Sequence, residues 1–119
     1  MTYNGTREII KGLLLGCGLS EVHTSKAHSP TSLPCGIVSL TGRHGEIKLI
    51  TGYANQRYRF EIHIVVNETE NADEELMDFV ERIDTQLQET YFTEIDKVDF
   101  YESLLSSKNI KVARFEVTV

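Results

Sequence analysis

The amino-acid sequence predicts an α+β fold, a two-layer sandwich in which helices cover one face of a mostly antiparallel sheet. Residues 57–66 alternate apolar and polar side chains with the two-residue period of a half-buried strand. Residues 71–88 then space their apolar side chains by three and four, as an amphipathic helix does. A length of 119 residues with 40% hydrophobic content suits a single domain with one core, spanning residues 1–119.

The N-terminal segment predicts a helix over residues 6–17. Its apolar side chains recur on one stripe, Thr6 is a suitable N-cap, and Gly16 and Gly18 supply a C-terminal stop. Residues 23–34 are rich in Ser, Thr, His and Pro and therefore predict an extended surface loop.

The first strands are predicted to form a hairpin that continues into the alternating strand. Residues 36–41 and 46–53 are rich in β-forming side chains, and the turn between them, residues 42–45, has Gly at both ends. A second turn over residues 54–56 leads into the strand at residues 57–66. Three consecutive antiparallel strands are therefore expected before the second helix.

The second helix begins with a run of carboxylates. Asn71 and Glu74 predict an N-cap and a capping box, and Asp73, Glu75 and Asp78 lie in or near the first turn. The helix dipole accounts for this acidic end. The alternative is an acidic surface that repels the DNA backbone, so that DNA passes along it without binding.

A second hairpin is predicted to complete the sheet. Residues 98–106 and 109–119 are expected to pair around a turn at residues 107–109. The resulting order is helix, three strands, helix, two strands, which is typical of an α+β sandwich. The closing strand has no Pro and little charge, so we expect an open sheet edge that pairs with a partner.

Charge and composition argue against several classes of function, namely the binding of nucleic acids, membranes and nucleotides. An excess of 18 acidic over 12 basic residues gives a net charge of −6, which disfavours adhesion to nucleic acid or to an anionic membrane. No apolar run approaches the roughly 20 residues of a membrane span, and no signal-peptide cleavage site is evident, so synthesis in the cytoplasm is expected. The sequence has no Gly-rich phosphate loop and no basic patch interleaved with aromatics. No cofactor, nucleotide or nucleic-acid site is therefore predicted.

The histidines and cysteines form no recognisable catalytic or metal-ligating pattern. No pair has the short spacing of a structural zinc site. Cys17 with His44 or His63 would make a nucleophile and a base, but Cys17 falls on the apolar stripe of the first helix, where a thiol is usually inert. We therefore expect no enzymatic activity, no metal and two reduced, partly buried thiols. The residues weighed are Cys17, Cys35, His23, His28, His44 and His63.

The order of these segments and their amino-acid sequences resemble those of a known protein family. The run ITGY at residues 50–53 leads to RFEIHIVV at residues 59–66, followed by LMDFV at residues 76–80 and a closing ARFEVTV at residues 113–119. In this respect the chain resembles the tail terminator proteins of long-tailed bacteriophages, including those described as tail completion or minor capsid proteins. The resemblance spans nearly the whole chain.

The resemblance implies a structural virion protein without catalytic activity. Tail terminators fold as an α/β sandwich and assemble as a hexameric ring that caps the tail tube, ends its polymerisation and presents a surface to neck or head-completion proteins. The expected partners are therefore further copies of the chain, the tail tube protein and a neck protein, with DNA passing through the lumen without specific binding. A stopper or completion protein from the same connector is the first alternative, and a small α+β enzyme or ligand-binding module is the second.

A ring also requires a head-to-tail interface between identical subunits. The candidate interface residues come mainly from two small basic spots, Arg43 with His44 and Arg57 with Arg59, and from the closing strand. The expected interface residues are Arg43, His44, Tyr53, Arg57, Arg59, Phe115, Val117 and Val119.

Overall fold

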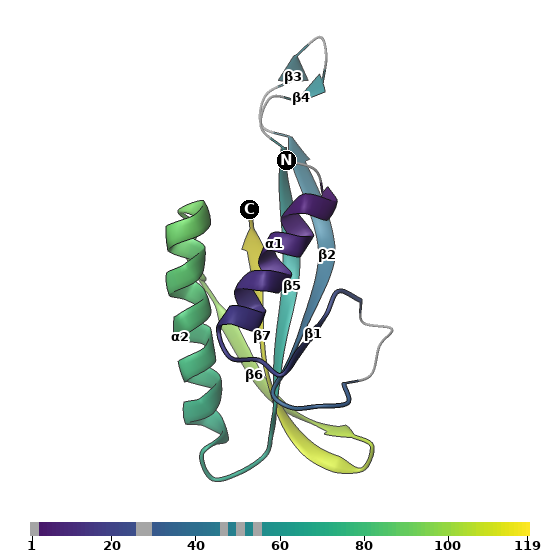
Figure 1. Cartoon of the computed structure of the whole chain (residues 1–119), viewed down its shortest axis with the longest axis vertical. Coiled ribbons are helices and arrows are strands. Elements are labelled where there is room, and N and C mark those ends of the chain that lie inside the picture. Colours follow the sequence, from purple (N-terminus) through teal and green to yellow (C-terminus); the bar gives the residue numbers. More distant parts are fainter. Residues whose placement is uncertain (1–2, 26–29, 46–47, 50–51, 54–55) are drawn as a thin grey trace.

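The computed structural model describes residues 3–25, 30–45, 48–49, 52–53 and 56–119, with no side-chain description between residues 44 and 56. Within these residues it confirms the predicted α+β fold, because two helices lie on one face of a five-stranded, mostly antiparallel sheet (Figure 1). In chain order the elements are α1 (Tyr3–Gly16), β1 (Glu21–His23), β2 (Cys35–Gly45), β3 (Lys48–Leu49), β4 (Gly52–Tyr53), β5 (Gln56–Asn67), α2 (Ala72–Tyr91), β6 (Val98–Leu105) and β7 (Lys108–Thr118).

The strand order of the sheet corrects one prediction. The order is β1-β2-β5-β7-β6, with β1 parallel to β2 and every other pair antiparallel. The closing strand β7 therefore lies inside the sheet, and the prediction that it forms an open edge was wrong. Alternation along a strand reports that one face is buried, but it does not report which strands lie on either side. The two edges of the sheet are β1 and β6.

The core lies between the sheet and the two helices. The alternation of β5 places Phe60, Ile62 and Ile64 on the helix-covered face, and all three are fully buried. Phe115 of β7 lies opposite Ile62 in the register and is 1% exposed. The helices contribute the matching apolar side chains Ile10, Leu14, Leu76, Ile83 and Leu87, each of which is fully buried.

The first helix begins earlier than predicted and leads into an unpredicted strand. It starts at Tyr3, so Thr6 is buried within the helix instead of capping it. The Tyr3 ring stacks on Phe60 with a centroid distance of 6.0 Å, which adds an apolar contact that favours the earlier start. Gly18 has a φ of 104°, a conformation that favours glycine. The chain turns there into β1, an unpredicted strand that ends at His23, the first residue of the segment predicted to be a loop.

The strand β2 pairs with β5 in a long hairpin, whereas the sequence predicted a hairpin between residues 36–41 and residues 46–53. The two strands pair from Cys35 with Val65 to Gly45 with Gln56, so the turn predicted at residues 42–45 was wrong. A register shift between Leu40 and Gly42 marks a β-bulge at which β2 continues.

Beyond this hairpin, the predicted strand at residues 46–53 is replaced by a small separate pair, β3 with β4. Residues 54–55 of the predicted second turn lie outside the described residues. The hairpin extends past the helices (Figure 1), and its end, where residues 42–45 pair with residues 56–59, is called the arm. The molecule measures 54 × 27 × 22 Å.

The second helix is confirmed, but its predicted cap is not. Asn71 makes no side-chain cap hydrogen bond. The Asn71 carbonyl accepts a backbone hydrogen bond from Glu75 at 2.9 Å, so the main chain satisfies the first turn without a capping box. At the other end Phe92 has a φ of 55°, and its N–H donates to the Gln88 carbonyl. The helix ends three residues later than predicted because this left-handed cap lies beyond Tyr91.

The last hairpin is confirmed, with its turn one residue earlier. Ser106 and Ser107 have φ values of 49° and 67°, as a tight turn between β6 and β7 requires. The C-terminal residue is fixed as well, because the N–H and carbonyl of Val119 both hydrogen-bond to the backbone of Tyr58. Both ends of β7 are therefore held.

The position of Phe115 leads to a stability prediction. Phe115→Ala is expected to lower the free energy of unfolding by about 3–5 kcal/mol, because it opens a cavity in the middle of the core. Lys108→Ala, at an exposed position on the same strand, is expected to stay within about 0.5 kcal/mol of the wild type. Urea denaturation measures both. A Phe115→Ala variant with wild-type stability would contradict the register of β7.

Candidate functional site

Polar side chains gather on the face of the sheet that the helices leave open. Because Phe60 and Ile62 point towards the helices, Arg59, Glu61 and His63 of the same strand lie on the opposite face. The other half of this face carries a small apolar cluster against which Leu33 and Ile37 pack. The buried members of that cluster are Cys35, Val65, Ile110 and Val112.

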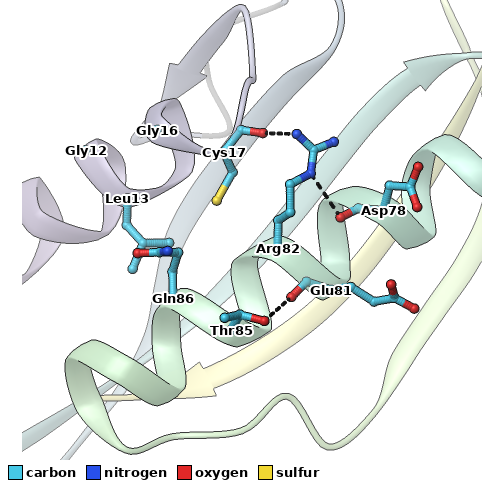
Figure 2. A pocket seen from close by; sticks show the side chains of 9 residues that line it. All are labelled: Gly12, Leu13, Gly16, Cys17, Asp78, Glu81, Arg82, Thr85 and Gln86. Carbon is cyan, nitrogen blue, oxygen red and sulfur yellow. Dashed lines mark hydrogen bonds between the residues drawn. The ribbon is translucent and has the colours of Figure 1, made fainter.

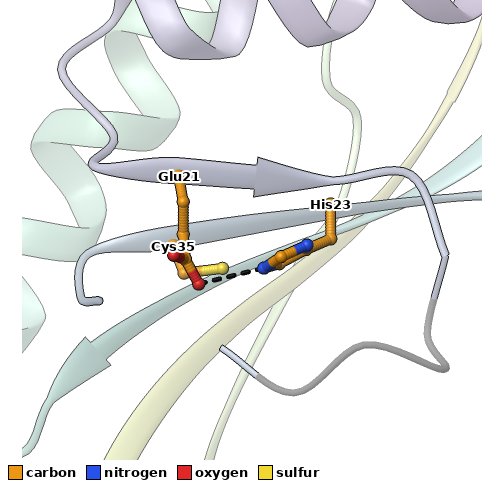
Figure 3. Close-up of side chains that lie close together, drawn as sticks. All are labelled: Glu21, His23 and Cys35. Atoms are coloured by element: carbon orange, nitrogen blue, oxygen red, sulfur yellow. Dashed lines mark hydrogen bonds and ion pairs between the residues drawn. The ribbon is translucent and has the colours of Figure 1, made fainter. Parts of the chain in front are cut away.

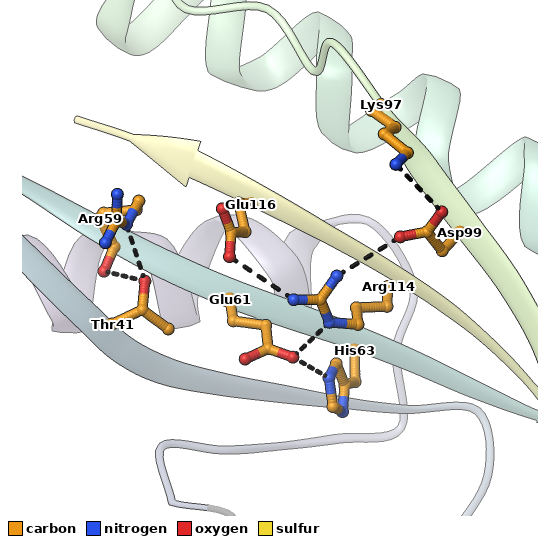
Figure 4. Close-up of polar contacts among 8 residues, drawn as sticks. All are labelled: Thr41, Arg59, Glu61, His63, Lys97, Asp99, Arg114 and Glu116. Atoms are coloured by element: carbon orange, nitrogen blue, oxygen red, sulfur yellow. Dashed lines mark hydrogen bonds and ion pairs between the residues drawn. The ribbon is translucent and has the colours of Figure 1, made fainter.

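A chain of ion pairs crosses the polar half of this face (Figure 4). Glu61 is only 8% exposed, and its Oε1 accepts a hydrogen bond from Arg114 Nε at 2.5 Å and lies 2.8 Å from His63 Nε2. Asp99 of β6 and Glu116 of β7 lie 3.4 and 3.5 Å from the other guanidinium nitrogens. The hydrogen bond with Glu61 is the main cause that raises the pKa of Arg114. A buried carboxylate must be paired, so this network fixes β5, β7 and β6 relative to one another.

The base of the arm carries a second polar contact. Thr41 Oγ1 donates to the Arg59 carbonyl at 3.1 Å, and Arg59 Nε donates to Thr41 Oγ1 at 3.3 Å (Figure 4). A Cβ at Gly42 would lie 3.0 Å from a guanidinium nitrogen of Arg59, so a glycine there leaves room for the guanidinium over β2. A cavity of about 240 Å³ lies beside it, lined by Gly42, Arg43, Arg59 and Thr118.

The predicted interface residues fall into three groups. Arg43, Arg57 and Arg59 are exposed on the arm or at its base, as predicted. Phe115 and Val117 are 1% and 2% exposed and belong to the core, so placing them at a surface was wrong. The remaining three are Val119, which is half-buried against the core and paired with Tyr58, and His44 and Tyr53, whose side chains lie outside the described residues.

Exposed apolar side chains concentrate on the edge strand β6, a feature that the sequence did not predict. Phe100 and Tyr101 are each 40% exposed, and Leu104 is 67% exposed. The inner side of β6 pairs with β7, and within the described residues no strand pairs with its outer side. The strand contains no Pro and no Lys, which commonly protect an edge, and its charged side chains are Asp99 and Glu102.

A groove of about 640 Å³ lies between the two helices (Figure 2). A Cβ added at Gly12 or Gly16 of α1 would meet no neighbouring side chain within 4 Å, so these two glycines leave open space beside α2. Arg82 crosses the groove and donates to the Cys17 carbonyl at 2.7 Å, which ties α2 to the end of α1. Burial raises the pKa of the Cys17 thiol, and Arg82 opposes this only in part. The thiol therefore stays protonated near neutral pH.

The nucleophile and base considered for Cys17 are not brought together. Cys17 belongs to the core on the helix-covered face, whereas His63 belongs to the polar network on the opposite face. The side chain of His44 and the whole of His28 lie outside the described residues. Cys17 and Cys35 are free and buried, as predicted.

Glu21, His23 and Cys35 lie together at the β1 edge of the sheet (Figure 3). One ligand atom from each residue lies within 4.8 Å of the others. Glu21 Oε1 lies 2.9 Å from His23 Nε2 and also accepts a hydrogen bond from the Thr31 N–H at 2.7 Å. The Thr31 hydroxyl donates to the second carboxylate oxygen at 2.8 Å. The loop after β1 is thereby attached to Glu21.

These contacts change two pKa values in opposite directions. The hydrogen bond with His23, followed by those from Thr31, lowers the pKa of Glu21 from 4.5 to about 2. Burial, with a contribution from the Glu21 charge, raises the pKa of Cys35 from 9.0 to about 11. Near neutral pH the carboxylate is charged and the thiol is protonated.

Sequence reasoning missed this cluster because it searched for short spacings between Cys and His only. Glu21 and His23 are two residues apart and so share one face of a strand. Cys35 joins them only through the parallel register, which pairs it with Glu21. A Glu-x-His pattern in a recognised strand would have been the available signal.

Comparison with known proteins adds no relative. No protein-family model matches the sequence, and a search of curated proteins finds no match. Within the described residues, neither helix is both long enough and apolar enough to span a membrane.

The lowered pKa of Glu21 predicts a pH-dependent contribution to stability. A carboxylate whose pKa is lower in the folded state contributes stability above its unfolded pKa, and the contribution disappears as the pH falls through the folded pKa. Glu21→Gln is therefore expected to be less stable than the wild type above about pH 4.5, with the difference vanishing as the pH approaches 2.

Thermal melts across this pH range measure the effect. Glu89→Gln, at an exposed position on α2, is the control and should melt like the wild type at each pH. A difference between Glu21→Gln and the wild type that stays constant from pH 6 to pH 2 would contradict the assignment.

Proposed function

We propose that this protein is a subunit of a ring that closes the tail tube of a long-tailed bacteriophage. In this proposal the ring ends tube polymerisation, presents a surface to the neck proteins and leaves a lumen for DNA. The family resemblance of the sequence suggests it, and the exposed edge of β6 is the observation that carries it. The protein acts by docking and occlusion, as part of the virion, without catalysing a reaction.

The β6 edge favours association with another chain. A strand of eight residues presents backbone donors and acceptors along its outer side, and such an edge is a template for pairing with another strand or chain. Phe100, Tyr101 and Leu104 add exposed apolar area on this strand. The opposite edge differs, because β1 has only three residues. This asymmetry suits a head-to-tail ring, in which each subunit contributes two different surfaces.

The base of the arm supplies the second surface in this proposal. Arg43 and Arg59 line a small cavity there, and Arg59 is positioned by Thr41. Guanidinium groups of this kind bind carboxylates of a partner in preference to apolar groups. We assign this surface to the tail tube protein or to the neighbouring subunit.

The acidic side of α2 fits the lumen. Asp73, Glu74 and Asp78 are exposed on its first turns, and Asp73 also forms an ion pair with Lys111 of β7. The net charge of −6 would repel a DNA backbone that passes close to the ring. In this arrangement DNA passes without specific binding.

Another connector protein, such as a stopper or completion protein, would use the same edge and arm. The two hypotheses differ in one activity, because only a terminator ends tube growth. Addition of the protein to polymerising tail tube protein separates them. Tubes of limited length with a ring at one end support the terminator, whereas unlimited growth supports another connector.

The β6 edge leads to a prediction about association. Leu104→Lys is expected to raise the dissociation constant of the ring about tenfold or more, because a charge would enter an apolar contact. The fold should be unaffected, since the side chain is 67% exposed. Met77→Lys, which adds the same charge at an exposed position on α2, is the matched control. Sedimentation is measured for each protein alone and with tail tube protein.

The comparison of Leu104→Lys with Met77→Lys tests whether β6 forms part of the interface. Equal association by the wild type and both variants would remove β6 from the interface. A wild type that stays monomeric both alone and with tail tube protein would contradict the ring itself.

The basic arm leads to a separate prediction. Charge reversal of Arg57 and Arg59 to Glu is expected to impair tail capping in a complementation assay, because exposed charges commonly set association rate and register. The free energy of unfolding should change by no more than about 0.5 kcal/mol per substitution. Lys11→Glu on α1, a charge reversal away from the arm, is the control.

Two results would contradict this assignment. Wild-type capping by the double variant would make the arginines an ordinary solvated surface. A collapse of the thermal melt would make them structural.

A further inference from the structure

We propose that Glu21, His23 and Cys35 bind one zinc-type divalent cation at the β1 edge of the sheet. The ligand set is a carboxylate oxygen, an imidazole nitrogen and a sulfur (Figure 3). Zinc in proteins uses these three ligand types, whereas Mg²⁺ and Ca²⁺ take oxygen ligands. This inference does not depend on the proposed ring.

The backbone brings the three ligands together. In the parallel pair of β1 and β2, Glu21 lies opposite Cys35. His23 follows Glu21 by two residues and therefore lies on the same face of the sheet. Two strands in fixed register, instead of a loop, thus set the positions of all three side chains.

The distances are compatible with one ion. The three ligand atoms lie within 4.8 Å of one another, and Glu21 Oε1 is already 2.9 Å from His23 Nε2. Ligand atoms around a tetrahedral zinc ion lie about 3.5 Å apart, as bond lengths of about 2.0–2.3 Å require. Side-chain movements on the order of 1 Å therefore close the site. A solvent water supplies the fourth ligand, because Glu21 and His23 are only partly buried.

The charges balance when the ion binds. The ion displaces the proton of the Cys35 thiol, which passes to solvent, and the sulfur binds as a thiolate. The thiolate and the Glu21 carboxylate together neutralise a divalent cation, while His23 binds as a neutral imidazole. Cys35 is fully buried, so a neutral centre avoids the cost of an uncompensated buried charge.

Thr31 positions the carboxylate for this role. Its N–H and its hydroxyl donate to the two oxygens of Glu21 at 2.7 and 2.8 Å. A carboxylate has about four lone-pair sites, so these two hydrogen bonds do not prevent it from binding an ion. Hydrogen bonds of this kind orient a ligand, and losing one typically costs about 10–100-fold in metal affinity.

A second Glu-x-His pair in the same sheet provides the internal contrast. Glu61 Oε1 lies 2.8 Å from His63 Nε2, much as in the first pair. The third group there is the guanidinium of Arg114, at 2.5 Å from the same oxygen. A permanent positive charge repels a metal cation, whereas the thiol of Cys35 supplies a ligand. The Glu61–His63 pair is therefore a matched control.

The experiment titrates chelator-treated, folded protein with Co²⁺ as a spectroscopic probe, and then displaces it with Zn²⁺. We expect one equivalent of Co²⁺ with a thiolate-to-cobalt charge-transfer band. Cys35→Ser should lose the band, His23→Gln should lose most of the affinity, and Thr31→Val should bind about 10–100-fold more weakly. His63→Gln should bind like the wild type, and Mg²⁺ should not compete. Circular dichroism verifies that each variant is folded.

X-ray absorption of the zinc-loaded wild type keeps the test independent of the variants. One sulfur at about 2.3 Å together with nitrogen or oxygen at about 2.0–2.2 Å is expected. A zinc shell without sulfur would overturn the proposal, as would an unchanged affinity in Cys35→Ser. Equal loss of binding in His63→Gln and His23→Gln would also overturn it. None of these outcomes depends on ring formation. A negative result for metal binding would therefore not count against the proposed ring.

Discussion

The central strand β5 is the element on which the rest of the structure depends. It pairs with β2 on one side and β7 on the other, and its strict alternation separates the two faces of the sheet. Phe60, Ile62 and Ile64 are fully buried under the helices. Because both helices lie on this face, all charged side chains of β5 lie on the other. The buried Glu61 then requires Arg114, which in turn holds Asp99 of the edge strand.

This one-sided arrangement explains where the surfaces proposed for assembly and metal binding lie. In the middle of the helix-free face the charged side chains are already paired with one another through Arg114. The residues proposed to bind a partner or a metal ion lie at the margins of the sheet, at β6, at the base of the arm and at β1. Each margin has different chemistry, with exposed apolar side chains on β6, arginines at the arm and the Glu21–His23–Cys35 cluster at β1. A head-to-tail assembly requires such unlike surfaces on one subunit.

Periodicity predicted the elements whose burial is one-sided. The strand at residues 57–66 and the helix at residues 71–88 were recovered almost entirely, because one face of each packs on the core. Elements decided by tertiary contacts were not recovered. The strand β1 is too short for a period to emerge, and the bulge near Gly42 carries β2 through a segment whose glycines predict a turn.

The candidate sites show the same limit. The exposure of Arg43, Arg57 and Arg59 was predicted, because charged side chains are seldom buried without a partner. Phe115 was misplaced, because strand order within a sheet is not encoded in alternation. Cys35 joins Glu21 through the register of two parallel strands, which spacing along the chain does not contain.

Amide hydrogen exchange of β6 tests the ring most directly. In dilute monomer, the outward-facing amides of β6 should exchange rapidly, because no strand within the described structure pairs with them. In the assembled state, alone or on the tail tube, the same amides should become protected while β7 changes little. Assembly that leaves β6 exchanging as it does in the monomer would contradict the account.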